Sequence, residues 1–363
     1  MLLRLLRGLL LPLSILLMSG CSAAVVVLRP SGDIAWQQRD LIVASTILML
    51  LIVVPVILLT LFFAWHYRQS NTKAHYDPNF HHSTGLELVI WSAPLLIIIA
   101  LGAMTWITTH TLDPFRKLSR VAESRPVAAG VKPLRVQAVA LDWKWLFLYP
   151  DYGIATVNEL AAPVDVPIDF QITSTTVMNS FFVPALAGQI YAMPAMETQL
   201  HAVINQAGDY KGMSANYSGA GFSDMHFHFY GMSAADFAAW VQKARDGGGN
   251  LDRDDYLALE KPSERVPVQR YGTVAPGMYD AILNLCVDPH KMCIRDMMKA
   301  DAAGGLGLAS AYNVGQLAYD APHAWGGESK DSAPLSRPYV LALCSVVPGA
   351  SPLSSPADAF GKQ

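Results

Sequence analysis

The sequence predicts a two-helix transmembrane hairpin, followed by an all-β sandwich and a helical C-terminal extension. Three observations predict this order: two long uncharged apolar runs lie before residue 113, short alternating segments follow between residues 134 and 233, and the spacing then becomes helical. The composition agrees, because 52% of the 363 residues are hydrophobic and only 15% are charged. The net charge of -3 gives no basic patch that would indicate nucleic acid.

The first segment, residues 1–20, has the pattern of a secretory signal. Two arginines precede a short apolar run at 9–18, which is well below the roughly 20 residues that a membrane span needs. The ending "MSGC" resembles a bacterial lipoprotein signal, although Met18 stands where Leu is usual. We therefore expect residues 1–20 to be removed and Cys21 to carry lipid at the start of the mature chain.

Two membrane-spanning helices are expected at 41–65 and 88–112, since each run has about 25 uncharged residues, enough to span with some tilt. A buried helix of a soluble protein is the competing interpretation, but two such runs with aromatic ends argue against it. If Cys21 is exported, residues 21–40 are outside and the connecting loop, 66–87, is cytoplasmic.

Basic residues partly support this topology. The loop carries Arg68 and Lys73, as the positive-inside rule prefers. A second basic group, 116–120, falls on the outer side, but it precedes a large exported domain, for which charge bias counts less.

The exported part is expected to begin with a β domain at 125–233. Alternating segments with turn signals between them are typical of a sandwich or small barrel. A helical extension is expected at 234–330, with Ser233 and Asp252 as N-caps, and a disordered tail at 331–363. The expected strands occupy 134–149, 164–174 and 225–233, and 197–215 is expected to form two strands joined by a turn at Gly208-Asp209.

The stretch "SANYSGAGFSDM", Ser214 to Met225, has the frame of a copper loop without its ligands. A β-sandwich with a ligand-bearing loop just before its last strand is the cupredoxin plan. Copper sites in that plan use Cys thiolate, His imidazole and a weak Met, because soft ligands select copper. An upstream loop, here 175–194, usually supplies one more His.

These features, with "VMNSFF" and "GQIYAM", resemble subunit 2 of the haem-copper respiratory oxidases, specifically of the bacterial cytochrome o type ubiquinol oxidases. The resemblance extends from the signal to about residue 245, and more weakly through the extension. Cytochrome c oxidase relatives hold two coppers in a Cys-x-x-x-Cys-x-x-x-His-x-x-Met pattern plus an earlier His. On this chain the two Cys positions hold Ser214 and Ser218, and the loop His position holds Phe222. The earlier His position holds Asn179. The backbone-carbonyl position falls at Asn216, and the Met is retained as Met225.

The replaced ligands predict that this chain binds no copper. Ser and Asn oxygens are hard, weak copper ligands, Phe offers none, and a lone thioether cannot hold the metal. The resemblance implies that haems and copper reside in the large partner subunit and that ubiquinol is the substrate of the complex. It also implies that the loop frame persists because it packs against that partner.

Other candidate residues are weaker. Glu87 begins the second span; it is a solvated carboxylate or, as the resemblance implies, lies near a proton entry in the large subunit. "DWKW", 142–145, is expected to supply packed aromatics under the loop. Cys286 and Cys293 could bind metal, but in an oxidising periplasm a disulfide is favoured, which leaves Cys344 over.

The sequence thus predicts subunit 2 of a proton-pumping quinol:oxygen oxidoreductase, with a structural or assembly role and no redox centre. The expected location is the bacterial inner membrane, multi-pass, with the C-terminal domain in the periplasm. Expected partners are subunit 1, smaller membrane subunits and membrane lipid. Two alternatives stay open: a copper-containing cytochrome c oxidase subunit 2, and a stand-alone membrane lipoprotein with a cupredoxin-like scaffold.

Overall fold

The computed structural model describes residues 25–75 and 77–302. The expected signal, Cys21, Cys344 and the expected tail therefore lie outside the described residues. The described residues divide into two compact units: residues up to 251 with 260–274, and residues 252–259 with 275–302.

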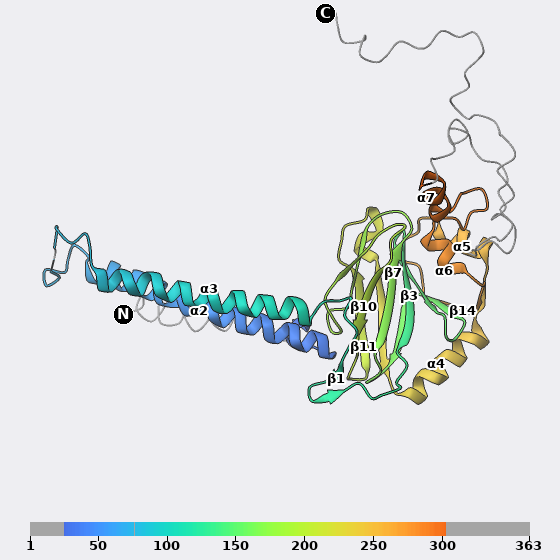
Figure 1. Ribbon diagram of the computed structural model, residues 1–363, viewed down its shortest axis with the longest axis horizontal. Helices are drawn as coiled ribbons and strands as arrows, with labels where there is room; N and C mark the ends of the chain where they lie inside the picture. The colour runs from blue at the N-terminus through green and yellow to red at the C-terminus, as the bar shows by residue number, and fades with distance from the viewer. Residues whose placement is uncertain (1–24, 76, 303–363) are drawn as a thin grey trace, which may run out of the picture. The chain divides into compact units, whose positions relative to one another are not determined.

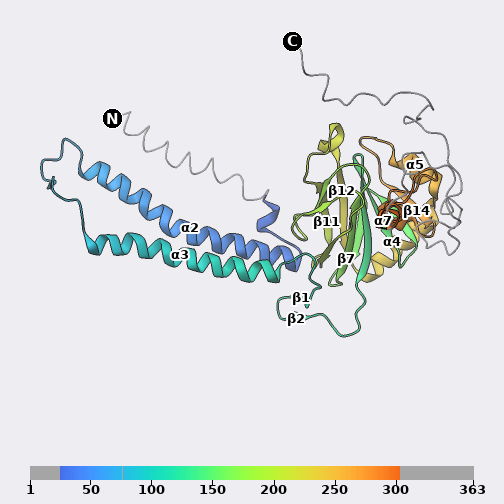
Figure 2. The same ribbon diagram turned by 45° about the horizontal axis from the view of Figure 1, so that its top comes forward.

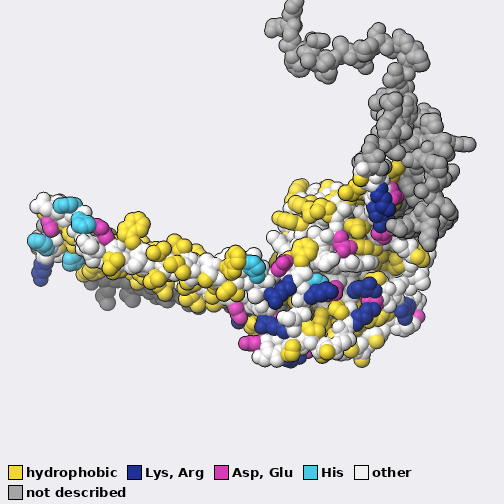
Figure 3. All heavy atoms as spheres, viewed as in Figure 1, with side chains coloured by type: hydrophobic (Ala, Val, Ile, Leu, Met, Phe, Trp, Pro, Cys, Tyr) yellow, Lys and Arg dark blue, Asp and Glu magenta, His cyan; other side chains and the backbone are white. Residues whose placement is uncertain are grey.

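Two long helices, α2 (Asp33–His66) and α3 (Thr84–Thr111), run side by side in both ribbon views (Figure 1, Figure 2). Both are long and apolar enough to cross a membrane. In the space-filling view the visible side chains along the pair are mostly hydrophobic (Figure 3), as lipid contact requires. Helix α2 begins at Asp33 rather than at Leu41, because the polar segment before the apolar run is also helical. Its first residue, Asp33, is held by Arg120, whose Nε donates to Asp33 Oδ2 at 2.9 Å.

The β domain is a sandwich of a seven-stranded and a five-stranded sheet, accompanied by the short 3-10 turn η2 (Val26–Leu28) and the two-stranded ribbon of β1 (Arg120–Ala122) and β2 (Arg125–Pro126). The larger sheet has the order β10, β7, β3, β4, β5, β14, β13, with bounds Thr198–Ala202, Ile168–Ser174, Leu134–Leu141, Lys144–Tyr149, Ile154–Val157, Gln269–Val274 and Gly249–Leu251. The smaller has the order β6, β12, β11, β8, β9, with bounds Glu159–Pro163, His226–Met232, Gly208–Ser214, Asn179–Phe182 and Ile190–Ala192.

The segment expected as one strand at 134–149 is an antiparallel pair, β3 and β4, in which Gln137 lies opposite Leu148 and Leu141 opposite Lys144. The chain reverses at 142–143, so the two tryptophans of "DWKW" fall on different parts of the pair. Strand β3 also pairs in parallel with β7. This central position explains why β3 and β4 are almost wholly buried.

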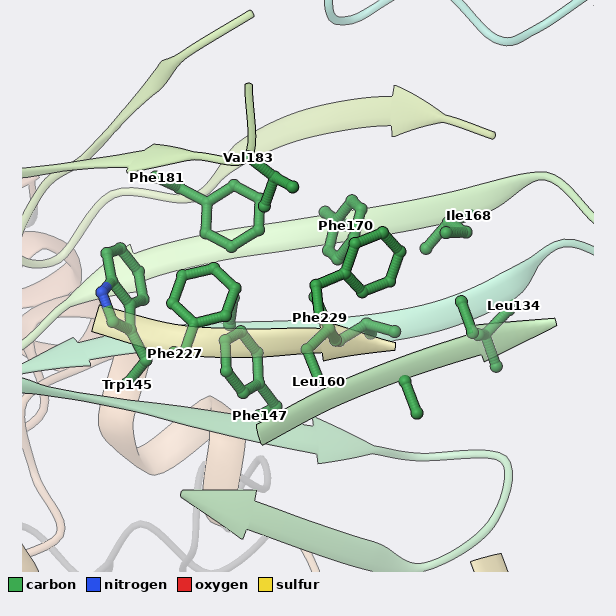
Figure 4. Close-up of a cluster of buried hydrophobic side chains, with 14 of the residues drawn as sticks. Leu134, Trp145, Phe147, Leu160, Ile168, Phe170, Phe181, Val183, Phe227 and Phe229 are labelled. Atoms are coloured by element: carbon green, nitrogen blue, oxygen red, sulfur yellow. The ribbon is translucent and has the colours of Figure 1, made fainter. Parts of the chain in front are cut away.

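The core lies between the sheets and is rich in aromatic rings (Figure 4). Successive residues of a strand point to opposite faces, so alternate positions supply the inward rings. Phe181 and Phe227 stack at 5.5 Å between ring centroids, and Trp145 meets Phe181 edge-on at 5.4 Å. Each such fully buried side chain stabilises the fold by about 1.5–3 kcal/mol.

After the sandwich, α4 (Ala234–Gly247) begins as predicted at Ser233, whose hydroxyl accepts the Asp236 backbone N–H at 3.1 Å. The extension is not wholly helical, because β13 and β14 return to the large sheet, where β14 pairs with β5. The second unit contains short helices and a Cys286–Cys293 disulfide. The helices are α5 (Arg253–Glu260), α6 (Met278–Leu283) and α7 (Ile294–Ala302).

Candidate functional site

The copper-loop frame lies between the end of β11 and the start of β12, with the short 3-10 turn η3 (Ala220–Asp224) inside it. Strand β8 pairs with the end of β11, so that Ser214 lies opposite Phe181. This pairing brings the upstream loop position, Asn179, next to the first loop position, Ser214. Sheet pairing alone therefore assembles the frame, with no metal needed to join the two loops.

Hydrogen bonds occupy the places of the missing ligands. The Ser214 hydroxyl donates to Asn179 Oδ1 at 3.0 Å, and the Asn216 side-chain amide donates to the Met178 carbonyl at 3.0 Å. The Ser214 backbone N–H donates to the Met225 carbonyl at 3.2 Å. Asn179 and Ser214 are only 1% and 4% exposed, and buried polar groups that are hydrogen-bonded in this way hold a loop in one geometry.

The other two positions, Ser218 and Phe222, lie beside aromatic side chains. The Trp143 indole N–H donates to the Ser218 carbonyl at 2.9 Å. Phe222, on η3, meets Tyr217 edge-on at 5.6 Å between centroids. The Ser218 hydroxyl is buried and has no hydrogen-bond partner among the described residues. The structure thus gathers Asn179, Ser214, Asn216 and Met225 closely, whereas Ser218 and Phe222 belong to an aromatic part of the same loop.

The two tryptophans of "DWKW" have separate roles. Trp145 is fully buried in the core, whereas Trp143 lies against the loop. A Cβ added at Gly221 would come within 2.6 Å of the Trp143 ring, and one added at Gly219 within 3.0 Å. Glycine is therefore required at Gly221 for the indole to lie flat against the loop backbone. The aromatic packing expected for 142–145 is present, with Trp143 as the residue that touches the loop.

Lys144, between these tryptophans, was not singled out from the sequence. Its side chain is fully buried, and its Nζ donates to the Asp142 carbonyl at 2.9 Å, the Lys261 carbonyl at 2.9 Å and the Ser263 hydroxyl at 2.7 Å. Burial lowers the pKa of the Lys144 ammonium, and the nearby Asp142 carboxylate partly opposes that effect. The residue ties segment 261–263 to the β domain. A lysine inside the segment 134–149, which is otherwise rich in apolar and aromatic residues, was the available signal.

The donor set does not fit a copper centre. Its side chains are amides, hydroxyls, a phenyl ring and one thioether. Copper sites of this kind use thiolates and imidazoles, and this set contains neither. Two of these oxygens are already engaged with each other, because the Ser214 hydroxyl donates to Asn179 Oδ1. Among the described residues, no group of three or more His, Cys, Asp or Glu is placed to hold a metal ion.

Glu87 lies in the first turn of α3, about half exposed, and accepts a hydrogen bond from His82 Nδ1 at 2.6 Å. A carboxylate in the first helical turn is favoured by the unpaired N–H groups there. His82 is the partner that the sequence analysis missed, and "HHSTGLE" placed it only five residues away.

Comparison with known proteins agrees with this geometry. A model of the cytochrome c oxidase subunit II periplasmic domain matches residues 153–229, and a model of the COX aromatic-rich motif matches residues 245–290. Over 270 residues the chain is 51% identical to ubiquinol oxidase subunit 2 of Acetobacter aceti, covering 74% of this chain and 85% of the relative. The chain belongs to the ubiquinol oxidase subunit 2 family.

Further members of the family are similar over most of their length. The cytochrome bo(3) ubiquinol oxidase subunit 2 of Pseudomonas putida is 45% identical over 302 residues, covering 83% of this chain and 91% of the relative. That of Pseudomonas aeruginosa is 48% identical over 268 residues, covering 74% and 78%. The family and the fold class read from the sequence are confirmed, and the family supports a quinol oxidase subunit over the cytochrome c oxidase alternative.

Proposed function

We propose that this chain is the copper-free subunit 2 of a proton-transporting quinol:oxygen oxidoreductase and that it has a structural role without a redox centre of its own. The observation that carries the proposal is the replacement of the copper ligands by a self-contained hydrogen-bonded cluster around Ser214 and Asn179. A loop stabilised in this way keeps its shape without metal. Electrons then enter the complex elsewhere, from a membrane quinol such as ubiquinol.

The partner that fits this role is a large haem-copper subunit 1, which holds the haems and copper, accompanied by smaller membrane subunits. Exposed apolar side chains occur in the degenerate loop and in the upstream segment 177–196, whose strand β8 pairs with β11, and they support a protein contact there because large exposed apolar patches mark interaction sites. The patch consists of Val177, Met178, Tyr191, Met196 and Tyr217, which are 40–76% exposed.

The proposed setting is the bacterial inner membrane, with the β domain in the periplasm. Two apolar helices anchor the chain, and a lipid on Cys21 would add a second anchor. Mass spectrometry of the mature N-terminus tests that part: a diacylated Cys21 is expected, and an unmodified N-terminus at another residue contradicts it.

The experiment that tests the function is purification through an affinity tag on this chain. The co-purified complex should show haem absorption and should reduce oxygen with a ubiquinol analogue as donor. Oxidation of reduced cytochrome c, with copper bound to this chain, would favour the cytochrome c oxidase alternative instead. Recovery of the chain without any haem-bearing partner would favour a stand-alone lipoprotein.

A further inference from the structure

A cavity of about 420 Å³ lies where the ends of the two helices meet the β domain. Its lining comes from the first turns of α2, from the segment 111–120 that follows α3, and from Gly188, Leu200 and His201. Because α3 ends at Thr111, the lining lies at the level where a membrane-spanning helix leaves the apolar layer and lipid headgroups begin.

The cavity has an excess of positive charge. Arg120 is neutralised by buried Asp33, at 2.9 Å. Arg116 and Lys117 are exposed and form no ion pair with a described residue, and Asp113 is the remaining carboxylate of the lining. Two cations therefore face one carboxylate. This is the same basic group that is expected on the outer side of the membrane, just before the exported domain.

His201 is a second and independent feature of the lining. It is only 5% exposed, and its Nδ1 lies 2.6 Å from Asp169 Oδ1. Its backbone N–H donates to the Pro114 carbonyl at 3.2 Å, which fixes it against the basic segment. The Nε2 atom is buried without a hydrogen-bond partner among the described residues. Buried polar atoms are nearly always paired, so this ring nitrogen beside the cavity is a site for a hydrogen bond to a ligand or to a water molecule.

The cavity continues toward an apolar groove. A second cavity of about 680 Å³ shares Asp33, Gln37 and Arg120 with the first. The part of its lining nearest the membrane is apolar and comes from Leu41, Ala44 and Met104, on the membrane-spanning parts of α2 and α3. The lining also includes two carboxylates, Asp40, which pairs with Arg39 at 2.7 Å, and the exposed Glu123. A cationic pocket joined to an apolar groove at the membrane surface matches the two ends of a phospholipid.

We propose that this pair of cavities binds the phosphodiester headgroup of a phospholipid. Arg116 and Lys117 contact the phosphate, the His201 ring forms a hydrogen bond to the headgroup, and an acyl chain lies along Leu41 and Met104. Charged hydrogen bonds to phosphate are the strong interactions of such a site. The apolar groove favours a lipid over free phosphate, which would use only the polar half.

The test uses the full-length chain in detergent, titrated with a fluorescent short-chain phosphatidylglycerol. The double variant Arg116→Gln/Lys117→Gln should weaken binding about 30-fold, which corresponds to about 1 kcal/mol for each cation near the membrane surface. The matched control is Arg68→Gln/Lys73→Gln, which removes two exposed cations at the opposite end of the hairpin and should leave the affinity within about twofold. His201→Phe should weaken binding while keeping the ring volume.

Competition identifies the ligand. Unlabelled phosphatidylglycerol and phosphatidylethanolamine should both displace the probe if the phosphodiester is recognised, and phosphatidylglycerol alone if net negative charge is required. Displacement by inorganic phosphate at similar concentration would overturn the lipid assignment. Equal weakening in both double variants would also overturn it, because attraction would then be a general surface effect. Unchanged lipid binding with loss of partner subunits from the Arg116→Gln/Lys117→Gln complex would assign the cavity to a protein contact instead.

Discussion

Trp143 should be the main side chain that holds the degenerate loop in place. Its indole N–H donates to the Ser218 carbonyl at 2.9 Å, and its ring lies so close to Gly221 that an added Cβ would come within 2.6 Å. Trp143→Phe keeps most of the packing and loses one hydrogen bond, so we expect a loss of about 1 kcal/mol. Trp143→Ala removes the packing too, and for this half-buried ring we expect about 3 kcal/mol, the low end for Trp to Ala.

Gly221→Ala tests the same contact from the other side. The new methyl group would overlap the Trp143 ring, and overpacking of this kind destabilises by about 1–3 kcal/mol. In Trp143→Ala the overlap is absent, so the two substitutions should be less than additive when combined. That non-additivity distinguishes a direct contact from two unrelated losses.

The assay is urea unfolding of the full-length chain in detergent, followed by circular dichroism in the β region. With a slope of about 2 kcal/mol per molar urea, Trp143→Ala should lower the midpoint by about 1.5 M. Tyr217→Ala is the matched control, since Tyr217 is an aromatic of the same loop that is 76% exposed; its midpoint should stay close to the parent's. A parent-like midpoint for Trp143→Ala would refute the reasoning, and so would a drop in the parent's stability when a copper chelator is added.

Three further predictions concern charged groups. Lys144→Met should destabilise the β domain by about 1–3 kcal/mol, because it removes the three hydrogen bonds that the buried ammonium donates to the Asp142 carbonyl, the Lys261 carbonyl and the Ser263 hydroxyl, and limited proteolysis should then cleave near segment 261–263 first. Arg135 and then Lys132 hold the pKa of Asp151 down at about 2. Because these partners are exposed and screened by solvent, Asp151 stabilises the fold at neutral pH by about 1 kcal/mol, and that contribution is lost as pH falls from about 4 toward 2; Asp151→Asn should flatten this part of the stability curve. Glu87→Gln should slow quinol oxidase turnover of the complex if Glu87 feeds a proton path, whereas Glu87→Asp should keep part of the activity.

Each of these predictions has a contradicting outcome. A Lys144→Met protein with parental stability and cleavage sites would show that the three hydrogen bonds do not fasten the segment. If the loss of stability between about pH 4 and 2 is unchanged in Asp151→Asn, other carboxylates dominate that loss. Asp77→Asn, in the loop between the helices, serves as control. Equal turnover of Glu87→Gln and the parent across a pH series, at equal haem content, would leave Glu87 as an ordinary interfacial carboxylate.

The local patterns of the sequence predicted the helices, most strands of the sandwich and the residues at the degenerate copper positions. The loop frame was readable because its spacing is local, within Ser214 to Met225. Its assembly with Asn179 follows from strand pairing between β8 and β11, which the resemblance implied but no local pattern encodes.

Long-range pairings account for what was missed. Strand β14 has no strong alternation, and it becomes a strand because it pairs with β5 and because Arg270 forms a bidentate pair with buried Glu159 at 2.7 Å. The partners of Lys144 lie more than a hundred positions along the chain. Likewise, the unpaired Nε2 of His201 depends on which segments meet at the helix ends, so only the folded arrangement reveals it.

The copper content of the full-length chain tests the central claim most directly. The chain, purified in detergent and incubated with copper under reducing and then oxidising conditions, should retain only trace copper after desalting and should show no visible absorption band. The amide, hydroxyl and phenyl groups at the former ligand positions give this expectation. Retention of two coppers per chain, abolished by substitution of Met225 or Ser214, would contradict the account and would assign the loop a role in electron transfer.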